Sequence, residues 1–206
     1  MVQSSIRRRR RASGFSLIEV LVALLVLSFG LLGMVGLQAT ALQNNREARL
    51  QSVAVNLARE LAEMMRGNKD VAMLATANPY VGDFSAIGET PASPASPSSC
   101  LSTGLSCANA TAVANAELTD WLARVSASLP GARVKICPDS APYSTAGLPQ
   151  WDCTAATTTD VIVVKIGWTH LSTNASLQDR NVRSNSTSSD NLPRVILPVT
   201  AGSTTL

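Results

Sequence analysis

The sequence contains few of the residues from which metal centres and catalytic sites are usually built. It has one histidine, His170, and no CxxC pair, so the spacing of a structural zinc site is missing. No nucleophile elbow, phosphate-binding loop or metalloprotease motif is present. Three aspartates, Asp139, Asp152 and Asp160, lie beside predicted turns, where carboxylates are most often solvated or cap the turn. We therefore expect the protein to be no enzyme and to hold no metal or cofactor.

Aromatic residues are also scarce, at 4% of a chain that is 46% hydrophobic. Ala, Ser, Thr and Val make up the difference, so a folded domain would have a core of small side chains that each bury little area. Core positions are expected for Trp121 and Trp168. The C-terminal part of the chain lacks a basic patch with interleaved aromatic residues, so we expect no nucleic acid among the partners.

Positive charge is concentrated at the N-terminus. The formal net charge is +3, but five positive side chains occur together from Arg7 to Arg11. Directly after them, Phe15 to Leu37 forms an apolar run with a single charged residue, Glu19. A helix of this length would be about 35 Å long, enough to cross a ~30 Å hydrocarbon core. Because basic residues stay in the cytoplasm, the pattern predicts a single-pass inner membrane protein with its N-terminus cytoplasmic and its C-terminal part periplasmic.

The helical pattern continues beyond the apolar run. No proline occurs between Met1 and Asn78, and from residue 38 onward apolar residues recur at steps of three and four, which places them on one helix face. These residues are Leu42, Leu50, Val53, Leu57, Leu61, Met64 and Met65. We expect one helix over residues 15–66, with Gly67 and Asn68 as its stop.

The remaining chain predicts a small α+β head. A second helix is expected over residues 113–128, and β-rich runs cover 132–137, 160–168 and 194–199. Loops are expected over residues 88–106 and 172–191. The predicted fold class is α+β: a long N-terminal helix, transmembrane in its first half, packed on a small head with an antiparallel β-sheet. The predicted organisation is a basic leader (1–14), a membrane and assembly helix (15–37), its amphipathic continuation (38–68) and the head (69–206).

Cysteine is missing from the N-terminal part of the chain. The four cysteines, Cys100, Cys107, Cys137 and Cys153, all follow the apolar run. An even number on the far side of a membrane span favours disulfides in an oxidising periplasm. Short loops close at low entropic cost, which favours Cys100–Cys107 and Cys137–Cys153. Four cysteines allow three pairings, and the sequence alone does not choose among them.

The functional signal lies where the arginines meet the apolar run, at Gly14-Phe15-Ser16-Leu17-Ile18-Glu19-Val20. A secretory signal peptide is cut after its apolar core, whereas a cut after Gly14 would remove the charges and keep the helix. A carboxylate in a membrane segment costs roughly 2.5–3.5 kcal/mol at mid-helix, so Glu19 needs a partner. These residues resemble the N-termini of type IV pilins and pseudopilins.

The resemblance implies cleavage between Gly14 and Phe15 by the prepilin peptidase, followed by N-methylation of Phe15. It also implies that Glu19, the fifth residue of the mature chain, pairs with the N-terminal amine of a neighbouring subunit or of its own. In major pilins a proline often interrupts the helix where this chain has Gly36.

A narrower resemblance, to minor pilins of the PilV type, rests on three stretches: LSFGLLGMVGLQ (27–38), Asn44-Asn45 and LARELAEMMRGN (57–68). It implies a structural minor pilin that primes assembly or sits at the tip of a type IV pilus, supporting twitching motility and adhesion. The implied partners are other minor pilins, the major pilin, a possible tip adhesin and inner membrane lipid, before the subunit joins the extracellular pilus.

Several alternatives stay open at this point. The same architecture would suit a minor pseudopilin of a type II secretion system, and the head could be a DNA-capturing or surface-binding adhesin module. Ala39-Thr40-Ala41 resembles a conventional cleavage site, although the apolar run is too long for a signal peptide. The long helix also argues against a twin-arginine export signal.

Overall fold

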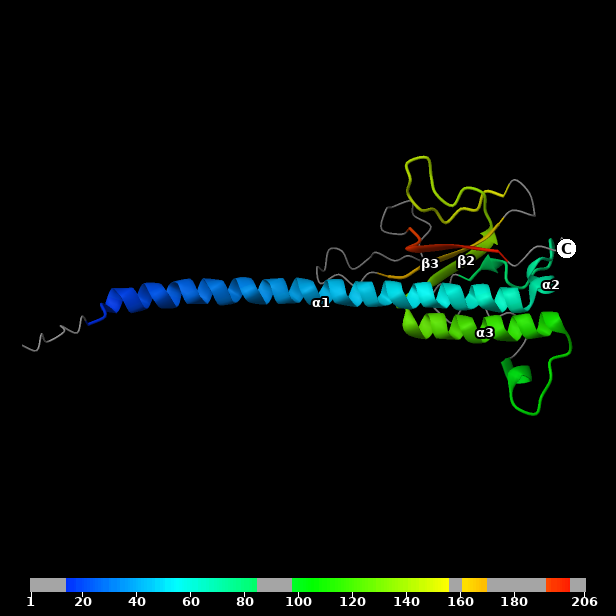
Figure 1. Cartoon of the computed structure of the whole chain (residues 1–206), viewed down its shortest axis with the longest axis horizontal. Helices are drawn as coiled ribbons and strands as arrows, with labels where there is room; N and C mark the ends of the chain where they lie inside the picture. Colours follow the sequence, from blue (N-terminus) through cyan, green and yellow to red (C-terminus); the bar gives the residue numbers. More distant parts are fainter. Residues whose placement is uncertain (1–13, 85–97, 156–160, 170–191, 201–206) are drawn as a thin grey trace, which may run out of the picture. The chain divides into compact units, whose positions relative to one another are not determined.

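The computed structural model describes residues 14–84, 98–155, 161–169 and 192–200. The chain divides into two compact units, one up to Glu47 and one from Ala48 onward. The boundary falls inside the first helix, α1 (Leu17–Gly67) (Figure 1). The predicted single helix over 15–66, with Gly67 and Asn68 as its stop, is therefore confirmed to within two residues at each end.

In the second unit, α1 contributes one buried face. Its buried residues recur at helical spacing and are Ala54, Leu57, Ala58, Leu61, Ala62 and Met65. The predicted apolar face is thus confirmed from Leu50 onward, with Leu50 and Val53 partly buried against the core. The short helix α2 (Lys69–Ala72) follows.

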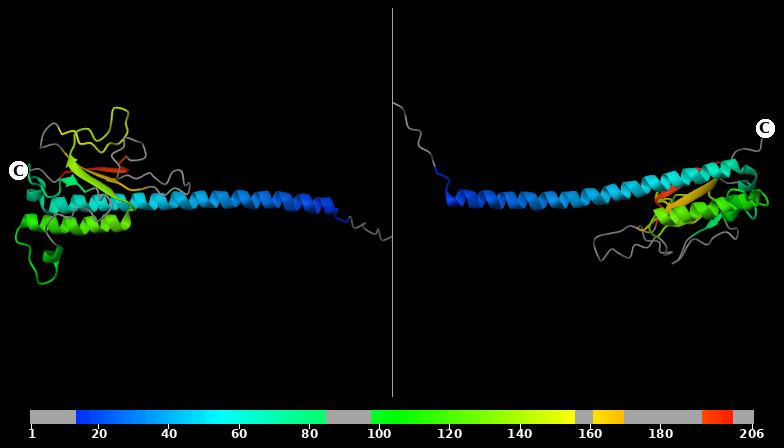
Figure 2. Two further views of the ribbon diagram at one scale, coloured as in Figure 1. Left: turned by 180° about the vertical axis from the view of Figure 1, so that it is seen from behind. Right: turned by 90° about the horizontal axis from the view of Figure 1, so that it is seen from below.

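The second long helix, α3 (Ala110–Ser128), lies beside this part of α1 (Figure 1, Figure 2). It begins three residues before the predicted start, because the Asn109 side chain caps it by accepting a hydrogen bond from the Ala112 N–H at 2.8 Å. The Trp121 indole N–H donates to the Leu57 carbonyl at 2.9 Å, which joins α3 to α1. A turn of 3₁₀ helix, η1 (Ser98–Leu101), lies within the predicted loop 88–106. The loop 172–191 lies outside the described residues.

The sheet is antiparallel and four-stranded, in the order β1-β2-β3-β4. Its strands are β1 (Gly82–Asp83), β2 (Arg133–Pro138), β3 (Ile162–Gly167) and β4 (Val195–Val199). The last three correspond to the predicted runs, and β1 was not predicted. In the register, Lys135 of β2 lies opposite both Asp83 of β1 and Lys165 of β3.

The core lies between the helices and one face of this sheet. Val164, Ile166 and Trp168 join the same buried cluster as α1 and α3. Alternation along β3 sends Val163 and Lys165 to the opposite, outer face, and both are buried there as well. Residues 139–155, here named the strap, contact this outer face through Lys165. The outer face and the strap form a second, more polar layer of the head.

Candidate functional site

The predicted cleavage and assembly residues lie at the start of α1. Gly14, Phe15 and Ser16 precede the helix and are exposed, with Phe15 83% exposed. The Ser16 carbonyl accepts hydrogen bonds from the N–H groups of Glu19 and Val20, at 3.0 and 3.3 Å. The bond between Gly14 and Phe15 is thus outside the helix. Glu19 lies in the first turn, where a carboxylate interacts favourably with the helix dipole.

The N-terminal part of α1 exposes a continuous apolar surface. Leu21, Leu25 and Leu32 are among many large apolar side chains there, with 55%, 47% and 70% of their surface exposed. Among the described helices, α1 alone is long and apolar enough to cross a membrane. A helix that leaves such an apolar surface uncovered needs lipid or other helices around it.

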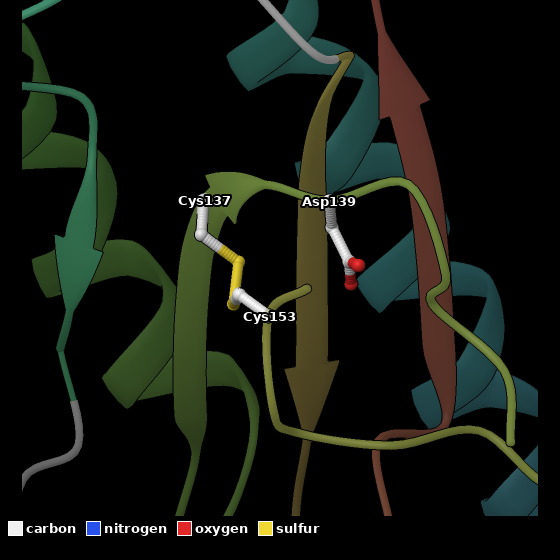
Figure 3. Close-up of side chains that lie close together, drawn as sticks. All are labelled: Cys137, Asp139 and Cys153. Atoms are coloured by element: carbon white, nitrogen blue, oxygen red, sulfur yellow. A yellow bond between two sulfur atoms is a disulfide. The ribbon is translucent and has the colours of Figure 1, made fainter. Parts of the chain in front are cut away.

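The two disulfides join Cys100 to Cys107 and Cys137 to Cys153, the pairing that short loops favour. Asp139 lies beside the second disulfide (Figure 3). Its carboxylate and the two sulfur atoms are close enough together to suggest a metal site. The sulfur atoms are bonded to each other, however, and the carboxylate is paired with Lys165. Since metal binding needs free thiolates, this group is a structural cross-link and not a metal centre.

Lys165 and Asp139 form an ion pair with both side chains fully buried. The Lys165 Nζ lies 2.5 Å from the Asp139 Oδ2 and donates to the Asp152 carbonyl at 2.7 Å. The other carboxylate oxygen, Oδ1, accepts from the N–H groups of Ala141 and Thr154, at 2.9 and 3.1 Å. Burial by itself would raise the pKa of Asp139, but the hydrogen bonds and the Lys165 charge outweigh it and hold that pKa below its ordinary value.

Comparison with known proteins points to the N-terminal segment. Residues 9–35 match the family described as the prokaryotic N-terminal methylation motif. Over these residues the chain is similar to the N-termini of prepilins. No curated protein and no solved structure matches it. The match covers Gly14, Phe15 and Glu19, and the head lies outside it.

The motif implies processing of this chain by the prepilin peptidase. Pilin-like prepilins are structural proteins, which fits the sequence-based expectation that the chain is not an enzyme. The motif together with the apolar helix indicates membrane anchoring. The long helix packed on a four-stranded antiparallel sheet is also a pilin-like α+β arrangement.

A second polar cluster lies on the outer face of the sheet in the head. The Arg133 guanidinium stacks on the Trp151 ring, 4.4 Å from its centroid. It also contacts the Asp83 carboxylate at 3.2 Å, and Lys135 reaches the same carboxylate at 3.9 Å. Arg133 is 5% exposed, so the strap and β1 enclose a charged residue that the β-strand pattern alone would leave at the surface.

Tyr80 is a titratable residue outside the strap whose pKa is raised. Its side chain is fully buried in the core. Burial, assisted by the negative charge of Glu117, raises the pKa of Tyr80 to about 12, and the nearby Asn68 side chain offsets part of the shift. Burial also raises the pKa of Glu117. Glu117 lies within α3, Asn68 directly follows α1, and Tyr80 precedes β1.

Sequence reasoning missed the partners of the strap. Asp139 was expected to be solvated or to cap a turn. It does cap the turn at Ala141, but it is buried, because Lys165 provides the opposite charge. His170 and Asp160 lie outside the described residues, and Asp152 is exposed. A lysine at the centre of an otherwise apolar run, VIVVKIGW, was the signal available, since a buried lysine needs an acidic partner.

Proposed function

We propose that this prepilin is a minor pilin that primes assembly or sits at the tip of a type IV pilus, supporting twitching motility and adhesion. The observation that carries the proposal is the uncovered apolar surface of α1, with Glu19 as its single charge. Lipid solvates this surface before assembly, and the helices of neighbouring subunits replace the lipid in the filament. A subunit can therefore move between the two environments with little change in apolar burial.

Within this proposal, residues 1–14 are a leader that is removed, and Phe15 becomes the methylated N-terminus. Glu19 then pairs with the N-terminal amine of a neighbouring subunit or of its own, which offsets the cost of a carboxylate in an apolar environment. The arginines from Arg7 to Arg11 keep the leader in the cytoplasm. Two disulfides in the second unit fit an oxidising compartment for the head.

The proposed partners are other minor pilins, the major pilin and a tip adhesin. The resemblance to the PilV type over residues 27–38 and 57–68 supports this choice. The second candidate is a minor pseudopilin of a type II secretion system. It would have the same motif and helix, so the two functions must be distinguished by the phenotype of a deletion strain.

The deciding experiment is a clean in-frame deletion, scored in one strain for surface pili and for secretion of folded exoproteins. We expect few or no pili with normal secretion, restored by the wild-type gene and not by Glu19→Ala. Glu63→Ala is the matched control, because Glu63 is an exposed carboxylate on the same helix whose ion pair with Arg66 is also exposed. Normal piliation with exoproteins accumulating in the periplasm would instead identify a secretion pseudopilin.

Leader removal has its own test. A Cβ added at Gly14 would meet no atom within 4 Å, so Gly14→Val should leave the fold intact and block only the peptidase. Gly33→Ala is the control, since a Cβ there also has free space. We expect the uncleaved precursor to accumulate in the Gly14→Val variant and not in Gly33→Ala, as measured by intact-protein mass spectrometry. An N-terminus at Leu42 in the wild-type protein would contradict the proposed processing.

A further inference from the structure

Lys165 depends on the strap for its burial. Within the part of the chain that the structure describes, both of its oxygen partners, the Asp139 carboxylate and the Asp152 carbonyl, belong to residues 139–155. The lysine itself is on β3, in the interior of the sheet, with its side chain 0% exposed. A charged ammonium group is stable in such a place only while both oxygens stay in position. Lys165 is therefore buried only when the strap is closed over it.

The outer face of the sheet is cationic without the strap. Lys135 and Lys165 are direct cross-strand neighbours, and like charges in such positions repel each other. Arg133 lies on the same face, two residues before Lys135, and Asp83 on β1 is the acidic partner of both. The strap supplies the Asp139 carboxylate for Lys165 and the Trp151 ring for Arg133. The strap therefore binds this cationic face within the same chain.

One covalent bond closes the neck of the strap. Cys137, the fifth residue of β2, is joined to Cys153 near the far end of the strap. Next to this bond, the Ser140 N–H and Oγ both donate to the Thr154 carbonyl, at 2.8 and 2.7 Å. Asp139 Oδ1 binds N–H groups from both ends of the strap, at Ala141 and Thr154. The disulfide thus holds together the two ends that orient the Asp139 carboxylate (Figure 3).

We propose that the strap is a redox-gated closure: the Cys137–Cys153 disulfide keeps it folded over the sheet and Lys165 sealed from water, and reduction opens it. In the reduced chain the two ends of the strap separate, Asp139 Oδ1 loses the Thr154 N–H donor, and the outer face exposes Lys165 to solvent. The Cys100–Cys107 disulfide, in the segment before α3, has no part in this closure. The proposal concerns the head and does not rest on the proposed role in assembly.

The closing reaction is an ordinary thiol–disulfide exchange. The thiols of Cys137 and Cys153 lose two protons and two electrons and form the sulfur–sulfur bond. The electrons pass to a disulfide-containing oxidant, which becomes a dithiol. Reduction by an added dithiol reverses each step. Sealing of Lys165 thereby becomes dependent on an oxidising compartment.

Amine acetylation of the full chain in detergent micelles tests the closure. The chain has three lysines: Lys69, Lys135 and Lys165. Lys69 is exposed, Lys135 is partly exposed, and Lys165 is buried, so the first two are internal references for the reagent. Acetylation by an N-hydroxysuccinimide ester is followed for each lysine by peptide mass spectrometry. We expect Lys165 to react on the order of 100-fold faster in Cys137→Ser/Cys153→Ser than in the wild type, from the size of the loop that the disulfide closes.

The matched control is Cys100→Ser/Cys107→Ser, which removes the other disulfide and should leave Lys165 as protected as in the wild type. Hydrogen exchange of the α3 backbone amides reports whether the core stays folded. Rapid acetylation of Lys165 with α3 still protected supports a local opening of the strap. Three results would overturn the proposal: a protected Lys165 in the strap variant, equal acetylation in both double variants, or loss of α3 protection together with that of Lys165.

Discussion

At the residue scale, the Lys165–Asp139 pair is the contact whose disruption we expect to cost most. Lys165→Met would leave the Asp139 carboxylate buried and unpaired, a change that costs about 3–5 kcal/mol in the free energy of unfolding. The double variant Asp139→Asn/Lys165→Met removes both charges and keeps an oxygen for the Ala141 and Thr154 N–H groups, so it should be much less destabilised. Urea unfolding of the full chain in micelles, followed by tryptophan fluorescence, measures the free energy of unfolding of both variants. A double variant no more stable than the single one would contradict this account.

The same pair predicts how stability depends on pH in acid. The pKa of Asp139 is held below its ordinary 3.8 in the folded chain. Its contribution is therefore complete above that value and is lost as the pH falls through the folded-state pKa. We expect the wild type to lose its stability advantage over the double variant as the pH falls below about 4. Urea midpoints of both proteins across this range check the prediction, and parallel curves would exclude Asp139 as the cause.

Tyr80 predicts the opposite dependence, in alkali. Its pKa is about 12 in the folded chain against an ordinary 10.0, so its contribution is complete below pH 10 and is lost as the pH rises toward 12. The difference corresponds to about 2–3 kcal/mol. We expect wild type and Tyr80→Phe to be of similar stability near neutral pH and the variant to become the more stable one in alkali. Denaturant midpoints of the two proteins provide the measurement, and a constant difference at all pH values would contradict it.

Residues that act within a short local motif could be predicted from the sequence, and residues that act through the sheet register could not. Gly14, Phe15 and Glu19 lie together at the start of one helix, so their spacing was readable directly. Asp139 and Lys165 are brought together only because β2 and β3 pair and the strap folds back over them. No local pattern in the sequence contains that information.

At the element scale, the contact between α1 and α3 can be tested with two tryptophans. Trp121 donates to the Leu57 carbonyl, whereas the Trp168 Nε1 has no partner among the described residues. Both side chains are fully buried, so Trp121→Phe and Trp168→Phe lose similar apolar area. We expect Trp121→Phe to cost more by about 0.5–1.5 kcal/mol, the net contribution of one hydrogen bond. Equal losses in thermal or urea unfolding would mean that the bond does not help to dock α3.

The elements themselves were predicted to the extent that they have a periodic pattern. The absence of proline up to Asn78 and the apolar spacing placed both ends of α1, and β-rich runs placed β2, β3 and β4. The two-residue strand β1 has no pattern of its own and exists because the Phe84 N–H and the adjacent residues pair with β2. The start of α3 differed because its first turn, after the Asn109 cap, is made of Ala and Thr and continues the polar composition of the preceding loop.

At the scale of the whole molecule, the two units are suited to different surroundings. The buried core begins at Ala54, with Leu50 partly buried against it, and the apolar surface of the first unit has no protein cover among the described residues. The head can therefore be stable in water while the N-terminal part of α1 needs lipid or other helices. The proposed assembly needs this division, because only the environment of the helix would change when the subunit joins a filament.

This division predicts that a fragment from Ala48 to the C-terminus folds without the rest of α1. Every residue of the buried cluster lies within the fragment, as do both disulfides. Exported to the periplasm behind a cleavable signal peptide, it should be soluble, oxidised and cooperative in thermal unfolding, whereas the full chain should stay in the membrane fraction after an alkaline carbonate wash. Gel filtration, circular dichroism and membrane fractionation measure these properties. Aggregation or gradual melting of the fragment would contradict this prediction. It would mean that the core within the fragment is too small to fold alone and that residues before Ala48 contribute to the stability of the head.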